Sequence, residues 1–169
     1  MPFAMRVHQP GGPEAMQWEE VEVADPGPGE ARIRHSAVGL NYIDVYFRTG
    51  LYPAPYMPLV PGMEGAGEVL AIGEGVTEVA VGDRVAYAGA PPGAYSQERL
   101  IAAAKLVKIP DGITDEQAAA MMLQGMTSEY LLRRTYPVKA GQTILFHAAA
   151  GGVGLIACQW AKHLGATVI

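Results

Sequence analysis

Three glycines near the end of the chain have the spacing of a phosphate-binding turn. Gly151, Gly152 and Gly154 stand between two apolar runs, TILFHA (143–148) and LIACQWAKHLG (155–165). Glycine has no side chain, so its backbone can approach a pyrophosphate, and the first N–H groups of a following helix can bind the anion. The usual G-x-G-x-x-G pattern would have a glycine in place of Ala149. The strand–turn–helix context favours a dinucleotide site over a turn that only packs tightly.

The segments around this turn predict the start of a parallel α/β sheet. The run 143–148 is a buried strand, the run after the glycines is a helix that ends at Gly165, and ATVI (166–169) begins a second strand. Upstream, Thr114 and Gln117 form a capping-box pattern, which predicts a helix through residue 135. We expect Gly125 to interrupt this helix or to admit a close backbone. Its buried face should comprise Met121, Met122, Leu123, Leu131 and Leu132.

The first hundred residues predict β-structure. Short runs with apolar residues at alternate positions are separated by glycine and proline, as in a barrel or sandwich. These runs are 5–9, 18–23, 30–40, 65–73, 83–89 and 94–103. The whole chain is therefore expected to be of mixed α/β class.

Composition narrows the function classes. The 169 residues carry a net charge of −5 and no basic run, which argues against nucleic-acid binding. The single cysteine, Cys158, cannot form an internal disulfide, and the start of the chain lacks a secretory signal, so we expect a cytoplasmic protein. The run 144–161 is nearly uncharged and long enough to cross a bilayer, but its central glycines favour a buried strand, turn and helix. We therefore expect no membrane partner.

Longer motifs point to a family. GQTILFHAAAGGVGLIACQWAK (141–162) resembles the signature of the quinone oxidoreductases, the zeta-crystallin-like branch of the medium-chain dehydrogenases/reductases. The resemblance is strongest to the bacterial NADPH:quinone reductases. It continues upstream through HQPGGPE (8–14), VGLNYIDVYFRTGLYP (38–53), PGMEGAGEV (61–69), VGDRVAY (81–87) and GAYSQE (93–98).

The resemblance implies a GroES-like β-barrel catalytic domain over residues 1–125, followed by the first βαβ unit of a Rossmann domain over 126–169. One βαβ unit cannot cover both faces of a parallel sheet, so we expect an N-terminal part of a longer reductase. By the same resemblance the full-length protein should be a homodimer and use NADPH. The residues that distinguish NADP from NAD would follow Ile169.

We expect this protein to work without zinc. Zinc alcohol dehydrogenases of the same superfamily hold their catalytic metal with a cysteine and a histidine, and here those places carry Asn41 and Met63. Neither an amide nor a thioether is a competent zinc ligand at such a site. The four histidines show no metal-ligand spacing either. We therefore predict no metal site.

A quinone is an acceptor that needs no metal, because hydride addition gives an aromatic hydroquinone anion. The resemblance places Asn41, Tyr46 and Tyr52 around this acceptor, where an amide and phenols could donate hydrogen bonds to developing oxyanions. Half-buried packing is the alternative for both tyrosines. Glu64, beside the former zinc place, is expected to be a structural partner rather than a base.

The resemblance also implies a set of NADPH contacts. Thr127 is one of these predicted contacts, and the alternative for it is a structural role in which its hydroxyl donates to a backbone carbonyl of its own helix. The full set comprises Tyr42, Ile43, Asp44, Val45, Tyr46, Thr127, Tyr130, Gly151, Gly152 and Val153.

Two other functions stay open at this point. The first is an NADPH-dependent reductase that delivers hydride to the β-carbon of an enal or enone, for which a proton donor near the α-carbon would be needed. The second is a non-catalytic nucleotide-binding protein. Reduction of a quinone is the function we expect.

Overall fold

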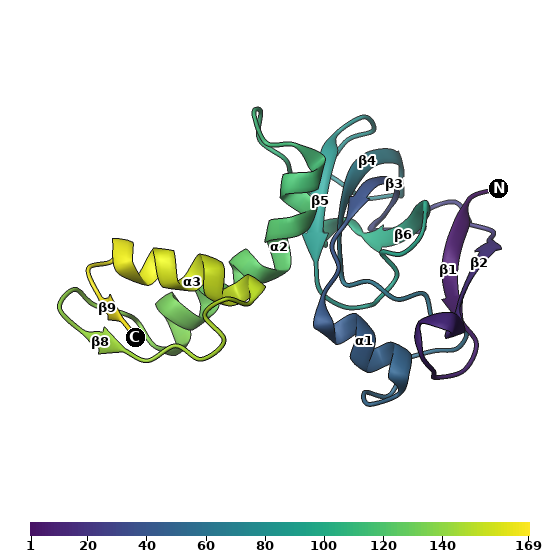
Figure 1. The fold of residues 1–169 in the computed structure, drawn as a ribbon. Helices are drawn as coiled ribbons and strands as arrows, with labels where there is room; N and C mark the ends of the chain where they lie inside the picture. Colours follow the sequence, from purple (N-terminus) through teal and green to yellow (C-terminus); the bar gives the residue numbers. More distant parts are fainter. The chain divides into compact units, whose positions relative to one another are not determined.

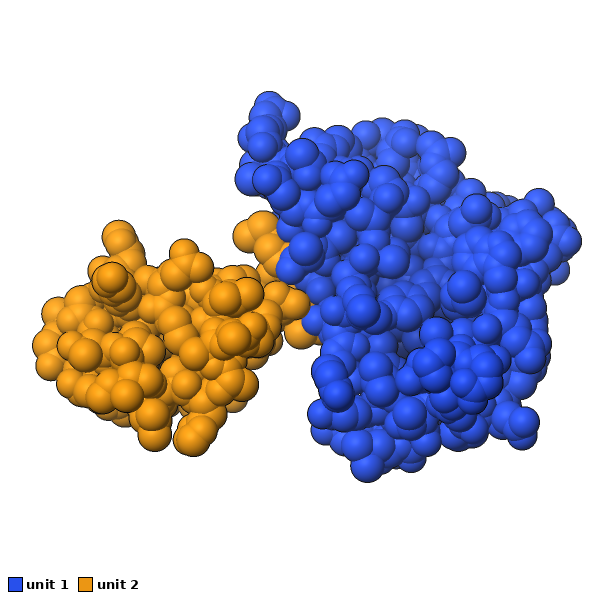
Figure 2. Space-filling view, in the orientation of Figure 1, with its two compact units in different colours: residues 1–120 blue, residues 121–169 orange.

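The computed structural model describes residues 1–169, which divide into two units, Met1–Ala120 and Met121–Ile169 (Figure 2). The first unit is built mainly of β-strands and the second mainly of helix (Figure 1). The mixed α/β class is thereby confirmed. The domain boundary placed between residues 125 and 126 stays a prediction.

An antiparallel sheet of five strands organises the first unit. Its order is β6 (Glu98–Ala102), β3 (Glu30–Val38), β4 (Glu64–Ile72), β5 (Arg84–Ala88) and β7 (Val107–Lys108). A second antiparallel pair joins β1 (Phe3–Val7) to β2 (Met16–Glu20), and Trp18 of β2 stacks on Phe3 with ring centroids 5.6 Å apart. Two short 3-10 turns, Pro13–Ala15 and Ala103–Lys105, complete the strand connections.

The core of the first unit follows the alternation seen in the sequence. Ile33, Val69, Val85 and Ile101 come from four neighbouring strands and are buried together. Because successive residues of a strand face opposite sides, one residue in two enters this core. Each of the six predicted strand regions overlaps an observed strand, although the bounds differ by several residues, as in β2, which ends at Glu20 rather than at residue 23. The two-residue strand β7 was not predicted.

Helix α1 (Tyr42–Thr49) interrupts this β-unit and lies at one end of the sheet (Figure 1). The carboxylate of Asp44 accepts a hydrogen bond from the backbone N–H of Asn41 at 3.0 Å, which caps the first turn. The helix ends at Gly50, whose φ of 78° suits a residue without a side chain. This helix was not predicted, since residues 38–53 were interpreted only as a family motif.

Helix α2 (Asp115–Glu129) confirms its predicted start. The Thr114 hydroxyl accepts from the N–H of Gln117 at 3.2 Å, and the Gln117 side chain accepts from the N–H of Thr114 at 3.0 Å. The expected effect of Gly125 is wrong, because α2 runs through it and a Cβ there would meet nothing within 4 Å. A π-helical segment, Tyr130–Thr135, follows.

The buried face predicted for this helix is only partly correct. Leu132 is buried, but Met121 is 48% exposed, and Met122, Leu123 and Leu131 are only partly buried. Ala157 and Ala161 of the next helix are 0% exposed and are the most deeply buried residues of the second unit's core. Small side chains let helix and strand backbones pack closely, so the long side chains are not all needed inside.

The second unit contains the predicted βαβ arrangement, but the buried strand expected over 143–148 is wrong in extent and burial, because only Thr143–Ile144 pair and Leu145 is 68% exposed. Strands β8 (Thr143–Ile144) and β9 (Thr167–Val168) pair in parallel, and α3 (Gly152–His163) connects them (Figure 1). Gly165 follows α3 with a φ of 87°, as expected for its end. Trp160 of α3 packs against the core of this unit. None of the helices combines the length and apolar character that a bilayer crossing requires.

Candidate functional site

Asn41 and Glu64 form a buried polar pair in the first unit. The side-chain amide nitrogen of Asn41 donates to Oε2 of Glu64 at 2.7 Å, and Glu64 is only 1% exposed. A carboxylate oxygen can only accept, so the Asn41 nitrogen must face Glu64. The amide nitrogen carries two hydrogens, and this bond uses one of them. The other N–H makes no hydrogen bond within the chain.

Gly39 makes room for this pair. A Cβ at position 39 would lie 2.4 Å from Oε2 of Glu64 and 2.5 Å from the backbone oxygen of Ala119. The N–H of Gly39 also donates to the backbone oxygen of Glu64 at 3.1 Å. The end of β3 and the start of β4 therefore enclose the carboxylate, and only glycine fits at position 39.

Asp44 faces the protein interior from the first turn of α1. Its Oδ2 accepts from the Asn41 backbone N–H and from the Tyr95 hydroxyl, each at 3.0 Å. Burial raises the pKa of Asp44, and hydrogen bonds from Asn41 and Tyr95 offset this shift in part. Burial, with Asp44 close by, likewise raises the pKa of Tyr95. Through Oδ2 the carboxylate of Asp44 thus holds α1 in place, while its Oδ1 is buried without a hydrogen-bond partner.

Three tyrosines form a row along α1 and the turn that follows it. The ring centroids of Tyr42 and Tyr46 are 5.5 Å apart, and those of Tyr46 and Tyr52 are 5.2 Å apart. The backbone N–H of Tyr52 donates to the oxygen of Tyr46 at 3.1 Å, which fixes the turn. None of the three phenol oxygens makes a hydrogen bond within the chain, so each is free to donate to a ligand. The structure brings the rings of Tyr46 and Tyr52 into tilted contact, with an interplanar angle of 54°. Their expected role around the acceptor stays a prediction.

His35, Tyr87 and Arg99 form a network that the sequence analysis missed. The Ser96 carbonyl lies 2.6 Å from Nδ1 of His35 and can only accept, so Nδ1 carries the proton. Nε2 then accepts from the Tyr87 hydroxyl at 2.8 Å. Burial, together with the Arg99 charge, lowers the pKa of His35 to about 4, although the Ser96 hydrogen bond opposes this shift.

Gly65 of β4 explains how these side chains meet across an intervening strand. A Cβ at position 65 would lie 3.0 Å from the His35 ring and 3.2 Å from the Tyr87 hydroxyl. Gly65, the second of the three glycines in PGMEGAGEV, could have indicated a close approach near the start of a strand. It could not have identified the two residues that approach each other.

The glycine turn of the second unit leads directly into α3. Gly151 caps the helix, and its N–H donates to the Ala148 oxygen at 2.9 Å. The next three N–H groups, of Gly152, Val153 and Gly154, have no acceptor in the chain, as is usual for a first helical turn. Ala148 has a φ of 56°, in the left-handed region.

Two of these glycines have different neighbours. A Cβ at Gly154 would lie 2.5 Å and 2.6 Å from the backbone oxygens of Ala148 and Ala149, so that position needs glycine for packing. A Cβ at Gly152 would meet the end of the Gln124 side chain, which can move. The exposed amides of Gly152 and Val153 are therefore the accessible part of an anion site.

Thr127 and Tyr130 lie in the same unit. The Thr127 hydroxyl donates to the Leu123 backbone oxygen at 2.6 Å, which is the alternative considered for this residue. Its oxygen keeps lone pairs that can accept from a ligand N–H. Tyr130 is 54% exposed at the start of the π-helical segment.

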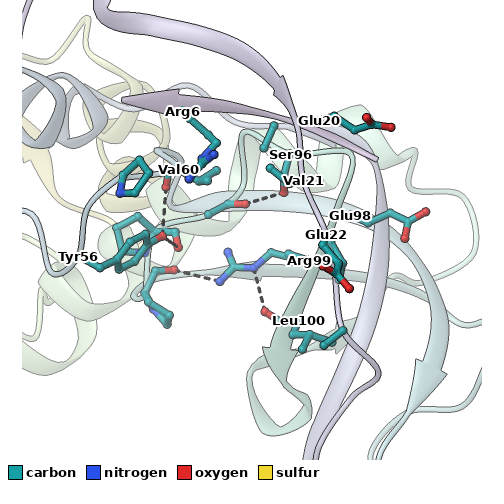
Figure 3. A pocket seen from close by; sticks show the side chains of 17 residues that line it. Arg6, Glu20, Val21, Glu22, Tyr56, Val60, Ser96, Glu98, Arg99 and Leu100 are labelled. Carbon is teal, nitrogen blue, oxygen red and sulfur yellow. Dashed lines mark hydrogen bonds between the residues drawn. The ribbon is translucent and has the colours of Figure 1, made fainter. Parts of the chain in front are cut away.

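A cavity of about 700 Å³ opens elsewhere in the first unit, between the β1–β2 segment and the 91–93 turn (Figure 3). Arg99 lies in its wall, and its guanidinium donates to the oxygens of Tyr87, Pro91 and Leu100 at 3.2–3.3 Å. The guanidinium also lies over the Tyr87 ring, 5.2 Å from the centroid. These contacts give Arg99 a structural role in fixing the 91–93 turn.

No three side chains of His, Cys, Asp or Glu come together in a way that could hold a metal ion. Asn41 is buried with Glu64 as its hydrogen-bond partner. Met63, which directly precedes Glu64 and β4, is buried as well.

Comparison with known proteins identifies the family. Residues 27–111 match the alcohol dehydrogenase GroES-like domain. The chain is 60% identical to a quinone oxidoreductase of Pseudomonas aeruginosa over 159 residues, which are 94% of this chain and 49% of that protein. It is 49% identical to a 2-haloacrylate reductase of a Burkholderia species over 175 residues, covering all of this chain and 52% of that protein.

A solved structure agrees with these relatives. The Escherichia coli quinone oxidoreductase in complex with NADPH superposes with a TM-score of 0.95 at 50% identity, over 98% of this chain and 51% of that chain. The chain thus spans about half the length of the relatives it matches. The expected GroES-like domain followed by the start of a Rossmann fold is confirmed. The chain belongs to the alcohol dehydrogenase GroES-like family, in the quinone oxidoreductase branch of the medium-chain dehydrogenases/reductases.

Proposed function

We propose that this protein transfers a hydride from NADPH to a quinone and uses no metal. One observation carries the proposal: segment 41–52 presents the free amide N–H of Asn41 and the free phenols of Tyr46 and Tyr52. These are neutral hydrogen-bond donors, which stabilise negative charge on a quinone oxygen without ionising. The names of the relatives support the same chemistry.

The residues of the second unit fit the proposed cofactor. The free N–H groups of Gly152 and Val153 and the positive end of the α3 dipole would bind its pyrophosphate, with Gly151 leaving the approach open. Within the same unit, Thr127 would accept a hydrogen bond from the carboxamide through its lone pairs, and Tyr130 would be a further contact of the cofactor. NADPH, when bound, supplies the hydride.

The residues of the chain then have simple tasks. Asn41 donates its free N–H to the quinone oxygen that gains negative charge, and Tyr46 and Tyr52 hold the ring and donate to an oxygen. Hydride addition reduces the quinone by two electrons and gives a hydroquinone anion, which takes one proton from solvent. No side chain has to act as a general base.

The similarity to a 2-haloacrylate reductase favours a second candidate, reduction of an activated carbon–carbon double bond. Hydride would add to the β-carbon, and a proton would be needed at the α-carbon. The free hydroxyls of Tyr46 and Tyr52 are the proton donors that this chemistry would use.

Assays with a small para-quinone and with 2-chloroacrylate, each followed by loss of NADPH absorbance, separate the two candidates. We expect turnover with the quinone and little or none with the acrylate. Turnover with the acrylate alone would replace the first candidate by the second. NADPH binding without turnover of either substrate would overturn both and indicate a non-catalytic nucleotide-binding protein.

We further propose that the complete protein is a zinc-free cytoplasmic homodimer. Both outer edges of the parallel pair β8–β9 lack a strand partner in this chain, and parallel sheets are normally extended and covered on both faces. Light scattering of the purified protein and metal analysis by mass spectrometry test these two points. A monomer at micromolar concentration, or stoichiometric zinc, would contradict the corresponding part.

A further inference from the structure

We propose that Glu64 is a positioning residue that fixes the side-chain amide of Asn41, so that one N–H is held by the protein and the other is presented to the hydride acceptor. The inference deepens the proposed function and rests on it for the identity of the acceptor. The orientation of the amide, however, is a property of this chain alone. It can be measured without any substrate.

The Asn41–Glu64 hydrogen bond is short and buried. Nδ2 of Asn41 and Oε2 of Glu64 are 2.7 Å apart, and both residues are buried. A hydrogen bond to a carboxylate is about twice as strong as one between neutral groups, and burial removes the competing water. An asparagine can normally exchange its oxygen and nitrogen by a half-turn of the amide. Here that turn would place the amide oxygen against a carboxylate oxygen, so one orientation is strongly preferred.

Glu64 is held rigidly by the sheet. Glu64 is the first residue of β4 and pairs with Ala88 of β5. Its carboxylate occupies the space that a side chain at position 39 would need. The Asn41 backbone is fixed as well, because its N–H donates to Asp44 at the start of α1. Both ends of the Asn41–Glu64 bond are therefore anchored in regular structure. A group held in this way can direct its free N–H at an acceptor with little loss of entropy on binding.

Glu64 does not act as a general base. Its hydrogen-bonded carboxylate oxygen faces an amide that has no proton to exchange in catalysis, and a quinone needs no general base. Glu64 thus acts on the acceptor only through Asn41.

Nuclear magnetic resonance tests the orientation directly, because Asn41 is the only asparagine in the chain. Labelling with side-chain 15N-asparagine gives a single NH2 pair, and we expect one proton shifted downfield and slow to exchange with water. The shift should disappear in Glu64→Met, which has similar length but no strong acceptor, and persist in part in Glu64→Gln. Glu68→Met, on the exposed face of the same strand, is the matched control and should leave the pair unchanged. An NH2 pair that does not respond to Glu64→Met would overturn the proposal. If that variant does not fold, an unshifted pair in the unsubstituted protein, or a pair unmoved by Glu64→Gln, would overturn it equally.

Kinetics test the consequence for the acceptor. We expect Glu64→Met to lower kcat for quinone reduction by about tenfold with an unchanged KM for NADPH, and Glu64→Gln to recover much of the loss. Combined with Asn41→Ala, Glu64→Met should cause no further loss, because its effect passes through Asn41. Additive losses would contradict a positioning role. Absence of quinone turnover in the unsubstituted protein would refute the proposed function instead, and the NH2 pair would still decide the role of Glu64.

Discussion

The amide nitrogen of Asn41 lies 2.7 Å from a carboxylate oxygen of Glu64, a residue 23 positions further along the chain. One residue caps a helix and the other begins a strand, so this bond joins two elements that differ in both type and sequence position. It gives an amide a defined direction inside a β-rich unit. The predictions below start from this pair and extend to the groups that hold it.

Asn41→Ala should lower kcat for quinone reduction by about a hundredfold, because it removes a hydrogen-bond donor to developing negative charge. The dissociation constant for NADPH should stay the same. Since Asn41 also stands at the N-cap of α1, a loss of about 1 kcal/mol in the free energy of unfolding is expected as well. Steady-state kinetics, NADPH titration and thermal unfolding measure the three effects. A kcat within about twofold of the unsubstituted protein would exclude a role for the Asn41 donor.

Gly39→Ala should destabilise the protein by about 1–3 kcal/mol, because the new methyl group would overlap the Ala119 backbone oxygen and the Glu64 carboxylate. Gly125→Ala is the matched control. Its Cβ would meet no atom within 4 Å and it lies in a helix, so stability should rise by about 0.5–1 kcal/mol. Chemical denaturation of both variants gives the comparison. Equal effects of the two substitutions would show that position 39 is not crowded.

Stability should fall as the pH is lowered from about 6.5 toward about 4 through the effect of His35. The pKa of its imidazole is about 4 in the folded protein and near its ordinary value of 6.5 in the unfolded chain, so the unfolded chain binds more protons in that range. The contribution is fully present above pH 6.5 and is lost on acidification, with a magnitude of about 3 kcal/mol.

His35→Gln provides the control for this pH dependence. Glutamine can donate to the Ser96 carbonyl and accept from Tyr87 without titrating, while every carboxylate titrates in both proteins. The difference in unfolding free energy between the two proteins should therefore narrow or change sign on acidification. A difference that stays constant from pH 7 to pH 4 would contradict a buried neutral His35.

Gly154→Ala and Gly152→Ala should distinguish the glycine that is needed for backbone packing from the glycine that leaves the amides open to the cofactor. The methyl group at position 154 would press on the backbone oxygens of Ala148 and Ala149, so we expect unfolding of the turn and a loss of NADPH binding of at least about tenfold. The group at position 152 meets a movable Gln124 side chain, so the second unit should stay folded with a smaller loss of affinity. Circular dichroism and NADPH titration measure both. Stronger destabilisation by Gly152→Ala would reverse this assignment.

Much of the fold could be predicted because its signals are local. Alternating apolar residues place the strands, and the Thr114–Gln117 pair begins α2 as expected. Helix α1 was missed because its capping partner is aspartate rather than glutamate or glutamine, and because its surroundings are strands. Gly125 was misjudged, since a glycine in a helix says nothing about what lies opposite it.

The site was less predictable, because its contacts are between distant residues. Asn41, Tyr46 and Tyr52 came from resemblance, and their binding roles stay predictions. The Glu64 contact with Asn41 and the His35–Tyr87–Arg99 network depend on strand register and on glycines that leave room. A sequence shows the glycine but does not show which side chain enters the space.

The chain has two tryptophans, and they belong to different units: Trp18 stacks on Phe3 in the first, and Trp160 packs on the core of the second. Each unit therefore carries its own fluorescent reporter. Replacing either indole by phenylalanine leaves emission from a single unit, so denaturation followed by fluorescence would show whether β-sheet and βαβ segment unfold in one transition or in two. The distribution of these two side chains makes the cooperativity of the chain directly observable.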